Sequence, residues 1–354
     1  MLVSPKSLVK IARSGNAVER LRAVRDGQAA VRVAAVGGAL STGVLHALRH
    51  PRTTSDLAEE IGARDVELLE AFLRALTAAG LVRTADGVHR LTRRSRALLG
   101  DDVVRAAYEG FSDFHTGLYR DLPGQLAGGR ARDDVSRHGD VIARLSRAME
   151  PLVHDALARE VRESGARRLL DVGCGDGSHL VHMLAAAPEA AGVGIEIDPA
   201  AAALAVHALA TAGLAHRGKV LTADVREVAA EGPRALGGPV DLALVANVVY
   251  YLPVAERTDL LRAVGGLLAP GGRLVVVSTM AEDSAFSRHF DLLLRAQDGG
   301  MSLPRPDEVA TQLTAAGLEV TAIQRLAPGD PLYAVTAERA RVAAAEAHVA
   351  PGAV

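Results

Sequence analysis

The sequence predicts an α/β protein in which a doubly wound, mostly parallel sheet follows a mainly helical domain. From residue 167 onwards, apolar strand-like runs alternate with helical segments, which is the order that builds parallel sheets. A glycine-rich loop joins the first of these strands to a helix, as the ligand-binding turns of such sheets do. Before residue 167, helices and one short hairpin follow each other instead. The chain therefore divides into two chemically different halves.

Length and composition agree with two globular domains. The chain has 354 residues and is 49% hydrophobic, which is enough for a sizeable core in each half. No apolar run reaches the roughly 18–20 residues that span a bilayer. The first ten residues have no long apolar stretch and no cleavage pattern, so we expect no signal peptide. A single cysteine excludes an internal disulfide and fits a cytoplasmic protein.

The net charge of −2 hides an asymmetry between the halves. Residues 1–168 hold 27 Lys and Arg against 21 Asp and Glu, which gives +6, and the remainder holds 13 against 21, which gives −8. The basic excess is spread over many helices rather than gathered in one run. A spread excess is typical of solvated helix faces, so nucleic acid is not the expected partner.

The first half has the pattern of a winged helix. Thr53 and Asp56 supply N-cap chemistry for a short helix that Gly62 closes. A two-residue turn at Asp86-Gly87 between β-rich runs predicts a hairpin of residues 81–84 and 88–92. The other helices are predicted at residues 28–49, 65–79, 102–122 and 140–163, with a loop over residues 123–138.

The second half predicts seven strands. The first five are separated by connections long enough for crossover helices, so they should be parallel. A helix over 304–317 and a short turn at Gly329-Asp330 then place the last two strands antiparallel to each other. The predicted strands are 168–172, 192–197, 219–222, 240–246, 272–277, 318–326 and 331–336, followed by an alanine-rich helix over 337–354.

The glycine loop after the first of these strands predicts a nucleotide-type cofactor site. Its spacing differs from the dinucleotide pattern, which requires a glycine where Ser178 stands, because the third glycine is one residue early, at Gly177. Glu196 ends the next strand, where a carboxylate can accept both hydroxyls of a ribose. Asp224 and Asn247 follow the third and fourth strands, and Asp224 can accept the amino group of an adenine.

These motifs resemble those of class I S-adenosylmethionine-dependent methyltransferases. The first half resembles the winged-helix dimerisation domain of small-molecule O-methyltransferases from plants and bacteria. The matching runs are LDVGCGDG at 170–177, GIEID at 194–198, AD at 223–224 and LAPGGRL at 268–274.

The resemblance implies a seven-stranded Rossmann-like methyltransferase sheet with a reversed last strand, and S-adenosylmethionine as cofactor, with S-adenosylhomocysteine as product. It also implies a homodimer formed through the N-terminal domain. We expect a dimerisation and substrate-lid domain at 1–139, a connecting helix at 140–166 and a methyltransferase domain at 167–354. The implied cofactor site comprises Asp171, Gly173, Gly175, Gly177, Glu196, Ile197, Asp224, Val225 and Asn247.

The scarce aromatic residues predict where a substrate binds. Eight of the ten lie in three segments, one on a helix of the first half and two after the fourth and fifth strands, and the resemblance implies that these segments line one cleft above the methyl donor. It also implies that Met149 packs near the reacting methyl group. The expected substrate-binding residues are Tyr108, Phe111, Tyr119, Met149, Tyr251, Phe286 and Phe290.

The catalytic group is open at this point. Phenol O-methyltransferases of this family use a His-Asp pair soon after the fourth strand, where this chain reads VVYYLP at 248–253. A base could come from His115, His154 or His289, with Tyr250 as a further candidate. Alternatively, the nucleophile is an amine that needs no strong base, or the substrate is a 2-oxo acid methylated at carbon while histidines hold a metal.

An alternative of another class is a DNA-binding winged-helix regulator with a methyltransferase-like domain. The helix that would read DNA carries Arg64, Asp65, Glu67, Glu70 and Arg74. That set has no basic excess, whereas a groove-reading helix presents Arg, Lys, Asn or Gln to the bases. We therefore expect a methyltransferase acting on a small molecule, in bacterial secondary metabolism.

Overall fold

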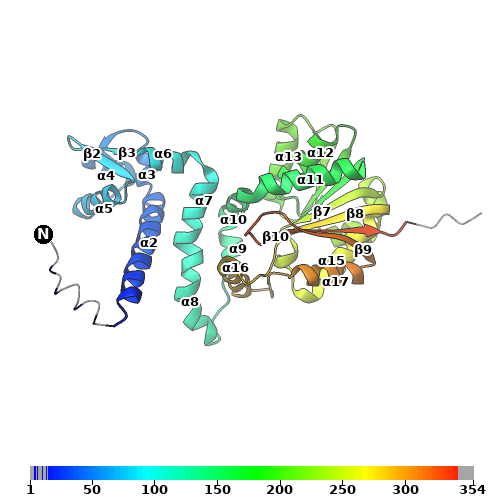
Figure 1. The fold of residues 1–354 in the computed structure, drawn as a ribbon. Helices are drawn as coiled ribbons and strands as arrows, with labels where there is room; N and C mark the ends of the chain where they lie inside the picture. The colour runs from blue at the N-terminus through cyan, green and yellow to red at the C-terminus, as the bar shows by residue number, and fades with distance from the viewer. Residues whose placement is uncertain (1–3, 5, 7–9, 11–12, 14, 342–354) are drawn as a thin grey trace, which may run out of the picture. The chain divides into compact units, whose positions relative to one another are not determined.

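The computed structural model describes residues 4, 6, 10, 13 and 15–341 (Figure 1). It consists of two units. The first extends to Arg130 and includes Asp134–Ala148. The second contains Ala131–Asp133 and the chain from Met149 onwards.

The first unit contains the predicted winged helix. Thr53 caps its short helix in a capping box with Asp56, and Gly62 ends that helix in a left-handed conformation, as predicted. Asp86 and Gly87 both have positive φ, 52° and 72°, which is the geometry of a two-residue hairpin turn. The elements are α2 (Ala17–Ser41), α3 (Val44–Ala47), β1 (Arg52–Thr53), α4 (Thr54–Ile61), α5 (Val66–Ala78), β2 (Val82–Ala85), β3 (Val88–Leu91) and α6 (Arg93–Gly100).

Two features of this region differ from the prediction. The helix predicted over 28–49 is wrong in its bounds: α2 begins at Ala17, and the chain breaks after Ser41 because Gly43 adopts φ 76°. A two-residue strand, β1, pairs with β3 and adds a third strand to the wing. On α5, the helix at the DNA-reading position, Arg74 lies 3.6 Å from Glu70.

The two longer helices of the first half are each interrupted. The predicted 102–122 helix is α7 (Asp102–Gly110), a π-helical turn (Phe111–His115) and α8 (Thr116–Leu126). The predicted 140–163 helix is α10 (Gly139–Ser146), a 3₁₀ turn (Arg147–Met149) and α11 (Glu150–Ser164), because Pro151 is tolerated only in the first turn of a helix. The predicted 123–138 loop is shorter, since α8 runs to Leu126 and α9 covers Asp134–Arg137.

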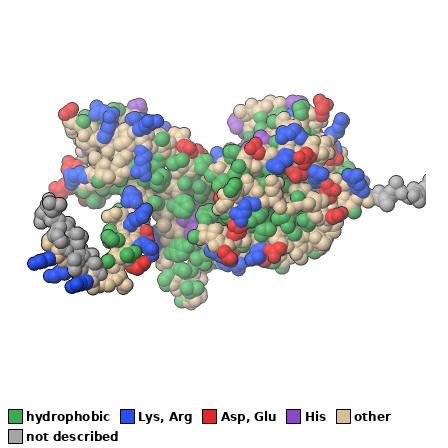
Figure 2. Space-filling model, in the orientation of Figure 1, with side chains coloured by type: hydrophobic (Ala, Val, Ile, Leu, Met, Phe, Trp, Pro, Cys, Tyr) green, Lys and Arg blue, Asp and Glu red, His purple; other side chains and the backbone are tan. Residues whose placement is uncertain are grey.

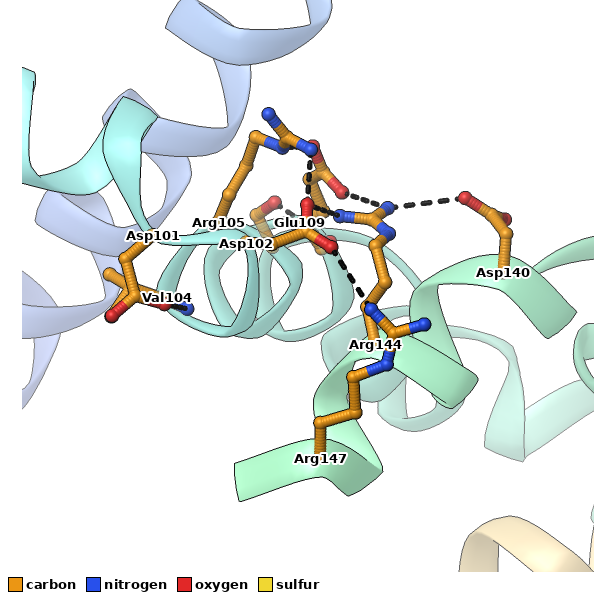
Figure 3. Close-up of polar contacts among 9 residues, drawn as sticks. Asp101, Asp102, Val104, Arg105, Glu109, Asp140, Arg144 and Arg147 are labelled. Carbon is orange, nitrogen blue, oxygen red and sulfur yellow. Dashed lines mark hydrogen bonds and ion pairs between the residues drawn. The ribbon is translucent and has the colours of Figure 1, made fainter. Parts of the chain in front are cut away.

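Charged side chains join α7 to α10 within the first unit (Figure 3). The guanidinium of Arg144 on α10 lies 2.7 Å from Glu109 of α7 and 3.1 Å from Asp140. It also lies 3.6 Å from Asp102, which pairs with Arg105 as well. The Arg144 side chain is only 16% exposed, so these contacts are less screened by solvent than surface ion pairs.

The second unit is a seven-stranded sheet with the order β6-β5-β4-β7-β8-β10-β9. The first five strands in sequence are parallel, and β10 is antiparallel to both β8 and β9, so the predicted fold class and reversed last strand are confirmed. The strands are β4 (Arg168–Val172), β5 (Ala191–Glu196), β6 (Gly218–Thr222), β7 (Val240–Ala246), β8 (Leu268–Thr279), β9 (Leu318–Arg325) and β10 (Leu332–Arg339).

Helices cover both faces of this sheet (Figure 1). On one face α11 packs with α12 (Ser178–Ala186) and α13 (Pro199–Thr211). On the other face lie α14 (Val225–Glu231), α15 (Val254–Leu267) and α17 (Pro306–Ala315), while α16 (Ala285–Arg295) follows β8. Both strand faces are buried, which explains the continuous Val and Leu runs.

The chain end differs from the predicted 337–354 helix. Residues 337–339 continue β10, because Ala337 pairs with Leu274 of β8 and with Val320 of β9. Residues 342–354 lie outside the described residues. Of the helices that the structure describes, none has the length and apolarity needed to cross a bilayer.

We predict that Arg144→Met lowers the free energy of unfolding by about 1–2 kcal/mol, because Glu109 and Asp102 keep Arg105 as a partner but lose the less exposed of their two shared cations. The control is Arg74→Met. The Arg74 side chain is 72% exposed, so this substitution should lower the free energy of unfolding by less than about 0.5 kcal/mol. Urea titration followed by circular dichroism measures both variants. Equal losses would show that the cluster in Figure 3 adds nothing beyond a surface pair.

Candidate active site

The glycine loop between β4 and α12 combines close packing with one open position. A Cβ on Gly173 would lie 2.5 Å from Val248, and one on Gly177 would lie 2.9 Å from the backbone of Ala205. A Cβ on Gly175, where φ is 54°, would have no other atom within 4 Å. All three glycines have positive φ, so the loop adopts a conformation that other residues rarely reach. Gly175 therefore presents bare backbone to open space.

Glu196 is fixed against this loop. One carboxylate oxygen accepts the Gly175 amide at 2.9 Å, and the other accepts the Asp198 amide at 3.0 Å. The next residue, Ile197, is 68% exposed, which is unusual for a large aliphatic side chain beside a sheet edge. The end of β5 thus offers an oriented carboxylate next to an uncovered apolar surface.

Asp171 lies in the interior behind the loop, on β4. Burial and, to a lesser extent, the negative charge of Glu196 raise the pKa of Asp171 to about 7, while the Leu180 amide partly opposes the shift. A buried carboxyl beside a second carboxylate is a place where a cationic group of a ligand is favoured. Burial also raises the pKa of the Cys174 thiol, so the single cysteine is not a reactive thiolate.

Asp224 and Asn247 have local structural roles. Asp224 caps α14 by accepting the Arg226 amide at 2.8 Å, and its other oxygen lies 2.7 Å from the Arg226 guanidinium. The hydrogen bond from Arg226 lowers the pKa of Asp224. The following Val225 is buried. Asn247 has φ 55° at the end of β7, and its amide donates to the Val277 carbonyl at 2.8 Å.

Two of the three aromatic segments meet within the second unit. The Tyr250 ring lies 4.5 Å from Tyr251 and 5.6 Å from Phe290, and Phe290 stacks on Phe286 at 6.3 Å. Phe286 is 46% exposed. We call Tyr250, Tyr251, Phe290, Leu294, Met301 and Leu303 the aromatic wall. Met149 packs against a different cluster, on the α11 side of the sheet.

The third aromatic segment lies in the first unit and does not present one uniform face. Tyr108 packs against the winged-helix core and accepts a hydrogen bond from Arg94 at 3.2 Å. In the π turn, the buried His115 ring stacks on Phe111 at 4.6 Å, and it lies 4.5 Å from Phe114. Tyr119 is 52% exposed. The wider π turn shifts these side chains from the spacing that they would have on a regular α-helix.

The remaining candidate bases have different surroundings. His289 is half-buried on α16, and burial lowers its pKa, so the imidazole is neutral at pH 7. Burial raises the pKa of Tyr250 well above its usual range, and that of Tyr251 as well, so both phenols stay protonated. His154 stacks flat on His182 at 4.2 Å and meets His179 edge-on at 5.3 Å.

The cluster of His154, His179 and His182 was missed by sequence reasoning, which singled out His154 alone. Its signal was the i, i+3 spacing of His179 and His182 on the helix after the glycine loop. His154 also lies 3.4 Å from the hydroxyl of Ser178, the first residue of α12. Burial and, to a lesser extent, the neighbouring His154 lower the pKa of His179 to about 4. Within the described part of the chain, no three His, Cys, Asp or Glu side chains converge as metal ligands.

The fold and these residues can be compared with known proteins. A model of the methyltransferase domain matches residues 141–323, more than half of the chain. The chain belongs to this methyltransferase family. It is an enzyme that depends on S-adenosylmethionine.

Two relatives of this methyltransferase come from Streptomyces lavendulae. The mitomycin biosynthesis 6-O-methyltransferase is 28% identical over 83% of this chain and 87% of its own. The L-tyrosine C(3)-methyltransferase is 28% identical over 67% of this chain and 66% of its own. The solved structure of the mitomycin 7-O-methyltransferase MmcR superposes with a TM-score of 0.74 at 24% identity, covering 93% of this chain and 99% of that one.

We predict that the histidine cluster makes the stability of this methyltransferase depend on pH. Because the pKa of His179 is lower in the folded protein than in the unfolded chain, its contribution is complete above about pH 6.5 and is lost as the pH falls towards 4. The loss should reach about 3 kcal/mol at most. Because the raised pKa of Asp171 acts in the opposite direction over the same range, the contribution of His179 is measured as the difference between wild type and His179→Gln in urea titrations at pH 7.5 and pH 4.5.

His179→Gln should flatten this pH dependence, while the exposed His216→Gln should keep it. If wild type and His179→Gln lose the same stability on acidification, then His179 is not the group that titrates.

Proposed function

We propose that the glycine loop and Glu196 hold S-adenosylmethionine and release S-adenosylhomocysteine. The observation that carries the proposal is the Glu196 carboxylate, held by the Gly175 and Asp198 amides at the end of β5. A carboxylate fixed in this way can accept two ribose hydroxyls through its free lone pairs. The bare backbone at Gly175 admits a ligand where a Cβ would intrude.

The neighbouring residues fit the other parts of the same molecule. The exposed Ile197 offers an apolar surface for one face of the adenine. Val225, the first residue of α14, is buried in the adjoining core. Asp224 can share its carboxylate between Arg226 and the adenine amino group. Asp171 has a buried carboxyl group, and a positively charged ligand would favour the ionised form of that group. When bound, S-adenosylmethionine supplies an electrophilic methyl group on a sulfonium.

We further propose that the acceptor is a small aromatic metabolite that packs against the aromatic wall. Val248 touches the glycine loop, and Tyr250 follows it after one residue, so the wall begins beside the cofactor loop. The relatives are named for 6-O-methylation in mitomycin biosynthesis and for C(3)-methylation of L-tyrosine. A neutral His289 suits a general base, whereas the protonated Tyr250 can only donate a hydrogen bond. His154 is engaged by Ser178 and His182.

We predict that Glu196→Ala weakens the binding of S-adenosylhomocysteine by about 10- to 100-fold, because a hydrogen bond to a charged group is worth about 1.5–3 kcal/mol. Isothermal titration calorimetry measures the dissociation constant. The control Glu189→Ala removes an exposed carboxylate of the same half and should bind like the wild type. An unchanged dissociation constant for Glu196→Ala would refute the ribose assignment.

The acceptor class is tested with a panel of catechol, aniline and phenylpyruvate, which offer an oxygen, a nitrogen and an acidic carbon. Mass spectrometry of the products locates the methyl group. Methylation of catechol or aniline without added metal supports direct transfer. Activity on phenylpyruvate alone, abolished by a chelator, would instead support metal-assisted methylation at carbon.

The proposed homodimer is supported by the surface of α2. Its first five turns are mostly exposed, although Val18, Leu21, Val24 and Val31 place large apolar side chains on one side of the helix. Leu21, Val24 and Val31 are 70%, 58% and 68% exposed. Elsewhere on the face drawn in Figure 2, acidic and basic side chains are interspersed on each unit. An apolar helix stripe of this kind is the natural surface for a second copy.

We predict that Leu21→Glu with Val31→Glu converts a dimer into a monomer at micromolar concentration, because each charge would be buried against the partner. Sedimentation equilibrium measures the mass. Asp26→Lys, on the opposite side of α2, is the control and should leave the dimer intact. A wild type that sediments as a monomer would contradict the dimer.

A further inference from the structure

Arg257 on α15 is a fully buried arginine without a carboxylate beside it. Its exposed fraction is 0%, and among the residues that the structure describes it forms no ion pair. Glu308 and Asp291 favour its positive charge from a distance, while Arg295 opposes it. Burying a guanidinium without an ion-pair partner is costly, and a well-packed apolar side chain would be cheaper for stability alone. The contacts of the guanidinium must therefore explain why a charged side chain is buried at this position.

The guanidinium joins two segments that are distant in sequence. Its Nε donates to the Leu252 carbonyl at 3.1 Å. Its Nη2 donates to the Ser302 carbonyl at 2.5 Å and to the Ser302 hydroxyl at 3.0 Å. The Ser302 amide in turn donates to the Tyr250 carbonyl at 3.3 Å. The planar fork of arginine makes these contacts at once, which a lysine ammonium on a flexible stem does not reproduce.

Both segments carry the aromatic wall. Leu252 ends the 3₁₀ turn of Tyr250 and Tyr251, and Ser302 lies between Met301 and Leu303. A second brace ties the same segment to α16, because the Leu303 amide donates to Asp291 at 2.9 Å. Arg257 and Asp291 thus hold neighbouring residues of one segment from two different helices.

The braced turn also begins at the cofactor loop. Val248, four residues before Leu252, packs against Gly173 so closely that a Cβ there would lie 2.5 Å from it. A displacement of the 249–252 turn therefore moves the aromatic wall relative to the methyl donor. An acceptor that packs against a displaced wall loses part of its contact surface in the pocket, so it binds less tightly and its KM rises.

We propose that Arg257 is a positioning residue, which sets the aromatic wall by clamping the 249–252 turn to Ser302 and so controls how well the acceptor binds. This inference rests on the proposed acceptor site. The role of Arg257 does not depend on the cofactor contacts, because Arg257 touches neither the glycine loop nor Glu196 in the described structure.

The test compares Arg257→Met, Arg257→Lys and the control Arg262→Met, which removes a 53% exposed guanidinium from the same helix. Hydrogen–deuterium exchange with mass spectrometry should show faster exchange in peptides covering 249–252 and 300–304 for both Arg257 variants. Peptides covering 168–177 should exchange as in the wild type. Arg262→Met should change neither set.

Binding and kinetics are measured on the same proteins. The dissociation constant of S-adenosylhomocysteine should change by less than about 3-fold, while kcat/KM for the panel member that the wild type methylates falls by about 10- to 100-fold, mainly through KM. Arg257→Lys should not restore kcat/KM, because an ammonium carries the charge but lacks the planar set of donors that clamps the turn. Ser302→Ala, which removes only the hydroxyl contact, should give a smaller loss and serves if Arg257→Met does not fold.

The outcomes separate this inference from the proposed function. Failure of the wild type to bind S-adenosylhomocysteine would refute the proposed function. If the wild type binds it but faster exchange spreads over all peptides, Arg257 only stabilises the fold, and the inference is overturned. Rescue by Arg257→Lys, or an unchanged KM in Arg257→Met and Ser302→Ala, would also overturn it.

Discussion

The hydrogen bond from the Gly175 amide to the Glu196 carboxylate is the interaction on which the proposed site depends. It joins the loop after β4 to the end of the neighbouring strand β5, so that two segments 21 residues apart present one surface. Gly175 can donate it because its φ of 54° suits a residue without a side chain. Without this contact the carboxylate would have to be ordered by the ligand itself, at a cost in binding free energy.

Costly polar burial in the second unit concentrates around this edge of the sheet. Asp171 is a buried carboxyl with its pKa raised to about 7, and His179 is an imidazole kept neutral by burial. Arg257 is a buried cation held by carbonyl groups rather than by a carboxylate. The two faces of the sheet, by contrast, are covered by apolar clusters. Stability is thus supplied by the faces, and the edge carries the groups that the proposed chemistry needs.

The sequence predicted the sheet well because its strands are buried on both faces and read as continuous apolar runs; β4 and β7 match to the residue. It failed where geometry depends on distant contacts. The π turn at Phe111–His115 lies where Gly37 of α2 packs directly on Ser112, which no local pattern reveals. The cap that Asp224 forms on α14 is local by contrast, and its role as a ligand group stays a prediction. Arg257 was not singled out, because its partner at Ser302 is 45 residues away and is partly main chain.

A crystal structure of the protein with S-adenosylhomocysteine would test the central claim most directly. The account predicts that both ribose hydroxyls lie within hydrogen-bond distance of the Glu196 carboxylate, with the adenine against Ile197 and the sulfur directed towards the aromatic wall. A nucleoside bound at another edge of the sheet, or one whose ribose makes no contact with Glu196, would contradict the account.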